Sequence, residues 1–72
     1  MRNSGAARAA RRVSLEAGRA RRNRLLQASD WTQLPDVPLA TKAAWATYRQ
    51  ALRDITEQPG WPTDITWPEP RA

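Results

Sequence analysis

The carboxylates are the first residues to consider for chemistry, because the chain contains no histidine and no cysteine. Asp54 and Glu57 lie three residues apart, a spacing that places both on one face of a helix and could make them a general acid–base pair. A solvated helix face explains the same pair better. Asp30 and Asp36 suit a helix cap and a turn. Since the sequence also lacks a glycine-rich phosphate loop, a nucleophile–base pairing and a metal-ligand spacing, it predicts a protein that is not an enzyme and needs no cofactor.

The tryptophans are the second group that could carry function, because an indole ring can stack on a ligand or a partner. In a chain this small tryptophans more often form the core, but Trp31 and Trp61 fall in predicted turns and are expected to be exposed. Arg49 is expected either to cover Trp45 or to pair with an aspartate of the turn at 30–36. The resulting candidate partner-binding set comprises Trp31, Arg49, Arg53, Asp54 and Trp61.

Arginine is concentrated at the start of the chain. Residues 1–24 carry eight arginines and one acid, whereas residues 25–72 carry four basic and six acidic side chains. Such a segment can hold an acidic protein, bind nucleic acid or act as a transit peptide. The absence of interleaved aromatic residues counts against nucleic acid, and a cargo of about fifty residues would be small for a transit peptide. This electrostatic arm comprises Arg8, Arg11, Arg12, Arg19, Arg21, Arg22 and Arg24.

These side chains have to be positioned by helices, and the strongest helical pattern runs over about 41–57. When successive residues are placed about 100° apart, this range has one continuous apolar face. Thr41 is placed to cap its start, and Pro59-Gly60 cannot continue it. The apolar face comprises Ala44, Trp45, Tyr48, Ala51, Leu52 and Ile55.

A second, weaker helix is predicted over about 14–28, with Ser14 as its cap. Residues 1–13 contain few large apolar side chains and are expected to be disordered, or at best transiently helical. Asp30 and Gln33 have the spacing of a capping box and predict a short helical turn between the two helices. The prolines that follow make the rest of the connection stiff and extended.

The residues after 58 are rich in proline and tryptophan and are expected to form an extended tail that folds back on the helices, against Trp45 and Tyr48. The predicted fold is therefore all-α, a small αα-hairpin-like domain over 14–72 preceded by the disordered arm. No apolar run is long enough to span a membrane, so we expect no membrane association. The predicted core comprises Leu26, Leu34, Trp45, Tyr48, Leu52, Ile55, Ile65 and Trp67.

Several of these stretches, read in order, resemble the tail assembly chaperone family of tailed bacteriophages, a module also found in some tail fibre assembly proteins. The most distinctive string is W-x-x-Y-R-Q-x-L-R-D at 45–54. Family members often have phenylalanine where Trp61 stands, and many have a longer N-terminal region in place of the arginine arm. The stretches that carry the resemblance are 22–26, 29–38, 45–55, 58–62 and 67–70.

The resemblance implies a non-enzymatic protein-interaction module that acts in the bacterial host cytoplasm during virion assembly. Proteins of this kind are thought to cover a tape-measure protein or another tail protein and to bring tail subunits to it. The alternative is a nucleic-acid-binding accessory protein that acts through the arginine arm, whose binding would weaken steeply with salt.

Overall fold

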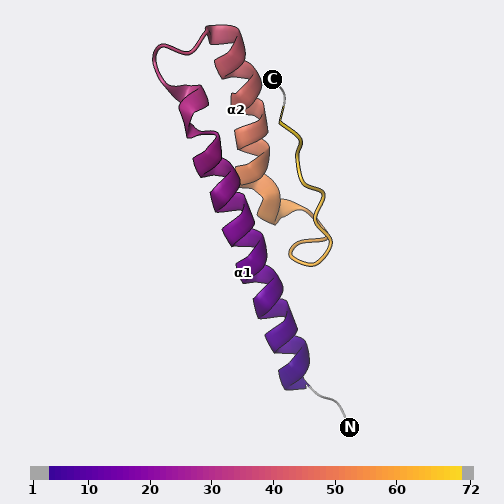
Figure 1. The fold of residues 1–72 in the computed structure, drawn as a ribbon. Coiled ribbons are helices and arrows are strands. Elements are labelled where there is room, and N and C mark those ends of the chain that lie inside the picture. Colours follow the sequence, from indigo (N-terminus) through magenta and orange to yellow (C-terminus); the bar gives the residue numbers. More distant parts are fainter. Residues whose placement is uncertain (1–3, 71–72) are drawn as a thin grey trace.

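The computed structural model describes residues 4–70, which form two antiparallel helices followed by an extended tail (Figure 1). Helix α1 spans Ser4–Ala28 and helix α2 spans Leu39–Arg53. Two short 3-10 helices, η1 at Asp30–Gln33 and η2 at Asp54–Glu57, follow the two long helices. The described part of the chain contains no strand, which confirms the predicted all-α class.

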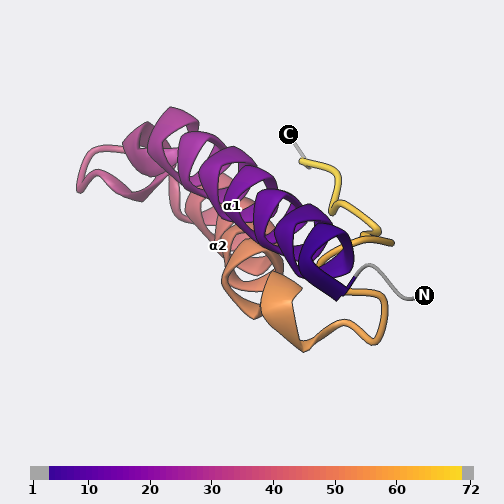
Figure 2. The same ribbon diagram turned by 90° about the horizontal axis from the view of Figure 1, so that it is seen from below.

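The two helices differ in length, so they cover each other only in part. Helix α1 has 25 residues and α2 has 15. Figures 1 and 2 show α2 beside the C-terminal half of α1, whereas the N-terminal half of α1 runs on past the end of α2. The molecule is consequently a rod, with extents of 59 × 19 × 14 Å.

The beginning of α1 differs from the sequence-based expectation. The helix starts at Ser4 rather than at Ser14, and residues 4–13, which we expected to be disordered, form its first turns. Ser14 is an interior helical residue and not a cap. Alanine and arginine, which dominate this segment, are among the best helix formers, so a helix that is anchored farther along can extend through it. Residues 1–3 of the expected arm lie outside the described part of the chain.

Helix α2 follows the predicted apolar pattern, with both ends displaced. It begins at Leu39 directly after Pro38, so Thr41 lies within the first turn and does not cap it. It becomes the 3-10 helix η2 at Asp54, and the chain leaves the helical conformation at Gln58, just before Pro59. Proline at the N-cap suits the start of a helix, because the first amide groups have no partner within the helix.

The core is narrow and centres on the C-terminal half of α2. Tyr48, Leu52 and Ile55 are the buried large apolar residues, with exposures of 6%, 0% and 0%. Four further residues of the predicted core are half-buried: Leu26, Trp45, Ile65 and Trp67. The prediction for Leu34 is wrong, since its side chain is 51% exposed. Leu34 follows η1 with extended backbone angles, at the end of the hairpin, where no third layer covers it.

The extended tail forms the third layer of the fold, but it packs against α1 more than we expected. A Cβ atom added at Gly18 in α1 would lie 2.8 Å from the Trp61 ring, so the glycine makes room for this indole. The Arg21 guanidinium lies over the Trp67 ring, with 4.4 Å between Arg21 Cζ and the ring centroid. The tail was expected to fold back against Trp45 and Tyr48. Pro68 and Glu69 do line a groove with Tyr48, but Trp61 and Trp67 lie on α1 instead.

Gln58 fastens the tail to the end of η2. Its side-chain amide donates to the Thr66 carbonyl at 2.7 Å and accepts from the Thr66 amide at 2.9 Å. Between these residues the chain turns sharply at Gly60, whose carbonyl accepts from the amides of Thr63 and Asp64. A Cβ atom at Gly60 would collide with the Asp64 carbonyl, so this turn requires glycine.

Candidate protein-binding surface

A buried arginine joins the C-terminal end of α1 to α2. Arg49 is 8% exposed and its Nη1 donates to the Leu26 carbonyl at 2.6 Å and to Ser29 Oγ at 2.7 Å. Its Nη2 forms a salt bridge with Asp30 at 2.8 Å. The last carbonyls of a helix lack partners within the helix, so Arg49 satisfies one of them and holds α1 in place. We call Leu26, Ser29, Asp30 and Arg49 the junction.

The junction is a structural element and not a surface offered to a partner. Ser29 is 2% exposed and its hydroxyl also lies within hydrogen-bonding distance of the Leu25 carbonyl, at 2.9 Å. Arg49 was a candidate partner-binding residue, and its burial removes it from the accessible surface. Of Asp30 and Asp36, the two aspartates of the turn that could pair with Arg49, Asp30 forms the salt bridge.

Arg53 and Asp54, the other charged members of the candidate partner-binding set, do not join Arg49 at the junction. Asp54 accepts a hydrogen bond from Gln50, one turn earlier in α2, at 3.1 Å. Within residues 4–70, Arg53 makes neither a hydrogen bond nor an ion pair, and Asp36 likewise makes no side-chain contact of this kind. Both Arg53, the last residue of α2, and Asp54, the first residue of η2, are exposed.

The predicted capping box at η1 is also replaced by a different arrangement. Ser29, and not Asp30, occupies the N-cap position, without a side-chain hydrogen bond to the backbone amides of η1. Thr32 is fully buried and its hydroxyl donates to the Ser29 carbonyl at 2.6 Å. Gln33 donates to Thr32 Oγ1 at 3.0 Å and to the Lys42 carbonyl at 3.2 Å, which connects η1 to the start of α2.

Three aromatic rings lead from the core to the surface at this end of the molecule. Tyr48 meets Trp45 edge-on, with ring centroids 5.5 Å apart, and Trp45 meets Trp31 at 5.9 Å with a tilt of 58°. Both geometries are favourable for aromatic pairs. Exposure rises along the series, from 6% for Tyr48 to 52% for Trp31. Trp31 is thus exposed, as its position in a turn suggested, yet held in place from below.

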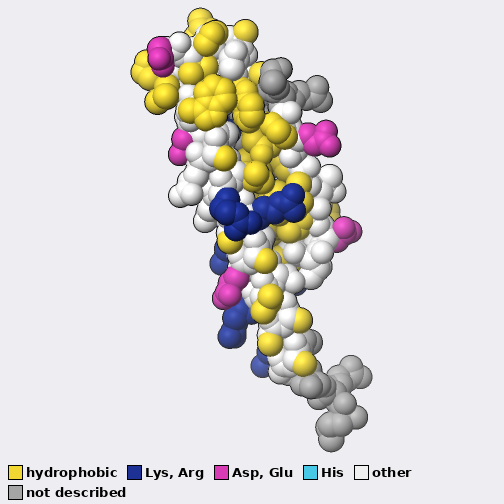
Figure 3. Space-filling view, in the orientation of Figure 1, with side chains coloured by type: hydrophobic (Ala, Val, Ile, Leu, Met, Phe, Trp, Pro, Cys, Tyr) yellow, Lys and Arg dark blue, Asp and Glu magenta, His cyan; other side chains and the backbone are white. Residues whose placement is uncertain are grey.

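The connection between the helices carries an unusual amount of exposed apolar surface. Trp31, Leu34 and Leu39 are 52%, 51% and 81% exposed, and we call these three residues the tip patch. Figure 3 shows hydrophobic side chains gathered at this end, whereas the Lys and Arg side chains visible on this face lie farther down the molecule. Exposed apolar clusters of this kind are typical of protein-interaction sites.

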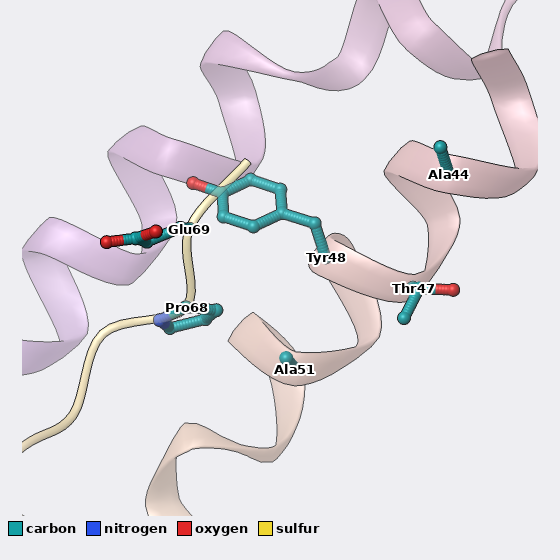
Figure 4. Close-up of a pocket in the computed structure, with 6 residues that line it drawn as sticks. All are labelled: Ala44, Thr47, Tyr48, Ala51, Pro68 and Glu69. Carbon is teal, nitrogen blue, oxygen red and sulfur yellow. The ribbon is translucent and has the colours of Figure 1, made fainter. Parts of the chain in front are cut away.

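A groove between α2 and the tail adjoins the aromatic series. It has a volume of about 460 Å³ and is lined from α2 by Tyr48 and three small residues, and from the tail by Pro68 and Glu69. Figure 4 shows the Tyr48 ring reaching toward these tail residues. Within residues 4–70 no hydrogen-bond partner is present for the Tyr48 hydroxyl, so the groove offers the Tyr48 and Thr47 hydroxyls and the Glu69 carboxylate beside its apolar lining. The small residues are Ala44, Thr47 and Ala51.

Trp61, the other tryptophan expected to be exposed, is half-buried against Gly18. It anchors the tail and is not available as a binding ring.

Leu39 is an exposed residue that the sequence did not single out, because its place directly before the expected helix gave no sign of the 81% exposure that the structure shows. Glu69 was likewise missed, although a charged residue between two prolines is a sign of an exposed, extended segment.

The seven arginines of the expected arm all lie on α1. Within residues 4–70, none of them forms a salt bridge. Arg21 lies on Trp67, and Arg22 donates to its neighbour Asn23 at 3.2 Å. The remaining five project from α1 without a polar contact to the described part of the chain: Arg8, Arg11, Arg12, Arg19 and Arg24.

Two further observations concern the described residues as a whole. Residues 4–70 contain no group of three or more carboxylate, histidine or cysteine side chains arranged to hold a metal ion. Among the same residues, neither helix combines the length and the hydrophobicity that crossing a membrane requires.

Comparison with known proteins identifies one family. The family model described as "Phage tail assembly chaperone protein" matches residues 15–71. This range contains the junction, the tip patch, α2 and the groove. No curated protein and no solved structure matches the chain.

Proposed function

Because the chain belongs to the phage tail assembly chaperone family, we propose that it assists tail assembly by binding a tail structural protein through the tip patch. The tape-measure protein is the first candidate partner, and the bacterial host cytoplasm is where this binding would take place. Family membership supports a role in phage tail assembly, and the choice of partner and surface is our proposal.

The observation that carries the proposal is the exposure of Trp31 above a fixed aromatic base. Tryptophan is among the residues that contribute most to protein–protein binding, chiefly when it is already ordered before the partner arrives. Trp45 and Tyr48 hold the ring from below, so little conformational entropy is lost when a partner covers it. Leu34 and Leu39, which follow Trp31 in the connection between the helices, add further exposed apolar area.

The groove extends this surface toward the tail. Tyr48 belongs to both features, since it lines the groove and contacts Trp45, which in turn contacts Trp31. A partner segment that covers the tip patch can continue along α2 and meet the small residues of the groove floor. Glu69 favours a basic or amide-donating residue at that end of the segment.

The experiment is a pull-down of the full chain from cells that co-express the tail structural proteins of the same phage, including its tape-measure protein. We expect capture of one tail protein, and we expect Trp31→Ser or Leu39→Ser to weaken it by roughly 10-fold or more, in line with the loss of a binding hot spot. Leu39→Ser should retain the unfolding free energy within about 0.5 kcal/mol, since its side chain is 81% exposed. Trp31→Ser also loses the ring contact with Trp45 and should cost about 0.5–1.5 kcal/mol, so circular dichroism is used to verify that this variant is folded.

Val13→Ser is the matched control, because Val13 is a comparably exposed apolar residue, at 64%, on the distant half of α1. It should capture the tail protein as well as the wild type does. Capture that is insensitive to Trp31 and Leu39, or equally sensitive to Val13, would show that the tip patch is not the binding surface. Absence of any captured tail protein would contradict the proposed function itself.

A further inference from the structure

The arginines of α1 are not scattered around the helix: five of the seven lie on one side, and all of these except the half-buried Arg22 are exposed. Successive residues of an α-helix are about 100° apart, which places Arg8, Arg12 and Arg19 within about 40° of one another. Arg11 and Arg22 flank them on the side that faces the rest of the molecule. We call these five residues the arginine row; at about 1.5 Å per residue it extends over roughly 21 Å of helix.

The charge of the arginine row is not compensated from within the molecule. Helix α1 contains one acid, Glu16, against seven arginines. Glu16 lies one turn from Arg12 and from Arg19, yet it forms a salt bridge with neither. The one salt bridge within residues 4–70 is that between Arg49 and Asp30, on the other helix. The row is therefore free to neutralise an external anion.

The row lacks the features by which a protein partner is usually held. Protein interfaces centre on large apolar or aromatic side chains that the partner covers completely. The only large apolar residue within the arc of the row is Leu15, which is half-buried in the molecule. Any affinity of this face therefore has to come from charge and hydrogen bonding alone, which is how proteins bind the phosphate backbone of nucleic acids.

A duplex suits the row better than a single strand does. Single-stranded nucleic acid is bound on aromatic platforms that stack with its bases. No aromatic residue stands among the arginines in the sequence of α1, and the Trp61 ring beside the row is half-buried against Gly18. The row is instead a band of guanidinium groups along one side of a helix, and each guanidinium can bind a phosphate with two parallel hydrogen bonds.

We propose that the arginine row binds the phosphate backbone of a nucleic-acid duplex, independently of base sequence. This activity goes beyond tail-protein binding and uses a different part of the molecule, since the row lies on α1 and the tip patch lies at the connection between the helices. Arg24 points away from the row by more than about 100° and takes no part in it.

The test is fluorescence anisotropy with the full chain and a labelled 24-base-pair DNA duplex at 50, 100 and 200 mM NaCl. If the five arginines each contact a phosphate, the logarithmic salt slope will be about −4.5, so that affinity falls roughly 500-fold over this range. Arg12→Gln and Arg19→Gln should each lower the slope by about 1 and weaken binding roughly 10-fold at 50 mM NaCl. Glutamine preserves the helix, because its helix propensity is close to that of arginine.

Arg24→Gln is the matched control, with the same change of charge on another face of the same helix. It should alter affinity by no more than about twofold and leave the slope in place. An equal effect of Arg24→Gln and Arg12→Gln would overturn the proposal, because binding would then follow net charge and not the row. Absence of binding at 50 mM NaCl would also overturn it, and so would tighter binding of poly-L-glutamate than of the duplex, which would assign the row to an acidic protein.

Discussion

The junction and the N-terminal half of α1 use the same amino acid in opposite ways. At the junction a single arginine, Arg49, is 8% exposed and donates to three acceptors from the α1 end and η1. In the N-terminal half of α1, Arg8, Arg11 and Arg12 are exposed and make no hydrogen bond or ion pair within the described residues. The difference lies in the surroundings of each side chain. Arg49 lies beside hydrogen-bond acceptors at the C-terminal end of α1, whereas the arginines of the projecting half of α1 have no other element packed beside them and are solvated.

This contrast also separates the parts of the molecule that carry stability from the part that does not. The junction, the buried residues of α2 and the tail are mutually packed, and the N-terminal half of α1 adds helix without burial. In a chain of 72 residues the free energy of unfolding is small, so loss of one packed element affects the whole domain. Changes in the projecting half should stay local.

Arg49→Met should have the largest effect on stability. The substitution keeps the aliphatic stem but removes the guanidinium donor from Ser29 Oγ and from the Leu26 carbonyl, which then accepts only from Ser29. This loss should cost about 3 kcal/mol of unfolding free energy. Urea unfolding followed by circular dichroism measures the change. Arg53→Met is the control on the same helix, and it should change stability by less than about 0.5 kcal/mol because Arg53 is exposed and unpaired. Similar losses in both variants would refute the structural role of the junction.

Gly18→Leu should have the next largest effect. The new side chain occupies the place of the Trp61 ring, so the tail has to leave α1, at a cost of about 1–3 kcal/mol. Limited proteolysis should then cleave the chain after residue 58 much faster than in the wild type. Gly5→Ala, a glycine replacement in the projecting half of the same helix, should leave the tail protected and add helix stability of less than about 1 kcal/mol. Unchanged protection in Gly18→Leu would mean that the tail is not held at this position.

Asp30→Asn should have a smaller effect, although Asp30 is bonded to Arg49 at 2.8 Å. The Asp30 side chain is 65% exposed, so solvent screens the ion pair, and an asparagine oxygen can still accept the hydrogen bond. We expect a loss of about 0.5 kcal/mol in urea unfolding. A loss as large as that of Arg49→Met would show that the charge of Asp30, and not the hydrogen bonding of the buried acceptors, dominates the junction.

Ala10→Gly should have the smallest effect on global stability. Glycine lowers local helix propensity by about 1 kcal/mol, but residue 10 lies in the projecting half, so the unfolding midpoint should not move. Amide hydrogen exchange should become faster on both sides of residue 10 and stay constant in α2. A lower unfolding midpoint would show that the projecting half is coupled to the packed body after all.

The sequence was sufficient for the parts of the fold that depend on local periodicity. The apolar face of α2, the hairpin connection and the end of α1 at Ala28 all follow from helical spacing and from the turn and proline residues. Hydrophobic periodicity did not predict the helix over residues 4–13, because this segment has no apolar face. Its alanines and arginines nevertheless have high helix propensity.

The path of the tail and the identity of the exposed residues could not be predicted in this way. The tail could pack on α1 or on α2, and its amino-acid composition does not predict which of the two helices it contacts. Gly18 is the one sequence signal for the path of the tail: a glycine inside a helix lowers its stability, and here it makes room for Trp61. The exposure of Leu34 and Leu39 depends on how the connection leaves η1, which is a tertiary property.

The central claim is that tail-protein binding belongs to the packed body, and it is tested most directly by a pull-down with a chain that begins at Ser14. The truncated and the full chain are compared in cells that express the tail proteins, with and without nuclease. We predict that both chains capture the same tail protein and that nuclease has no effect. Capture that requires residues 1–13, or that disappears with nuclease, would contradict the claim and move the binding function to the arginines of α1.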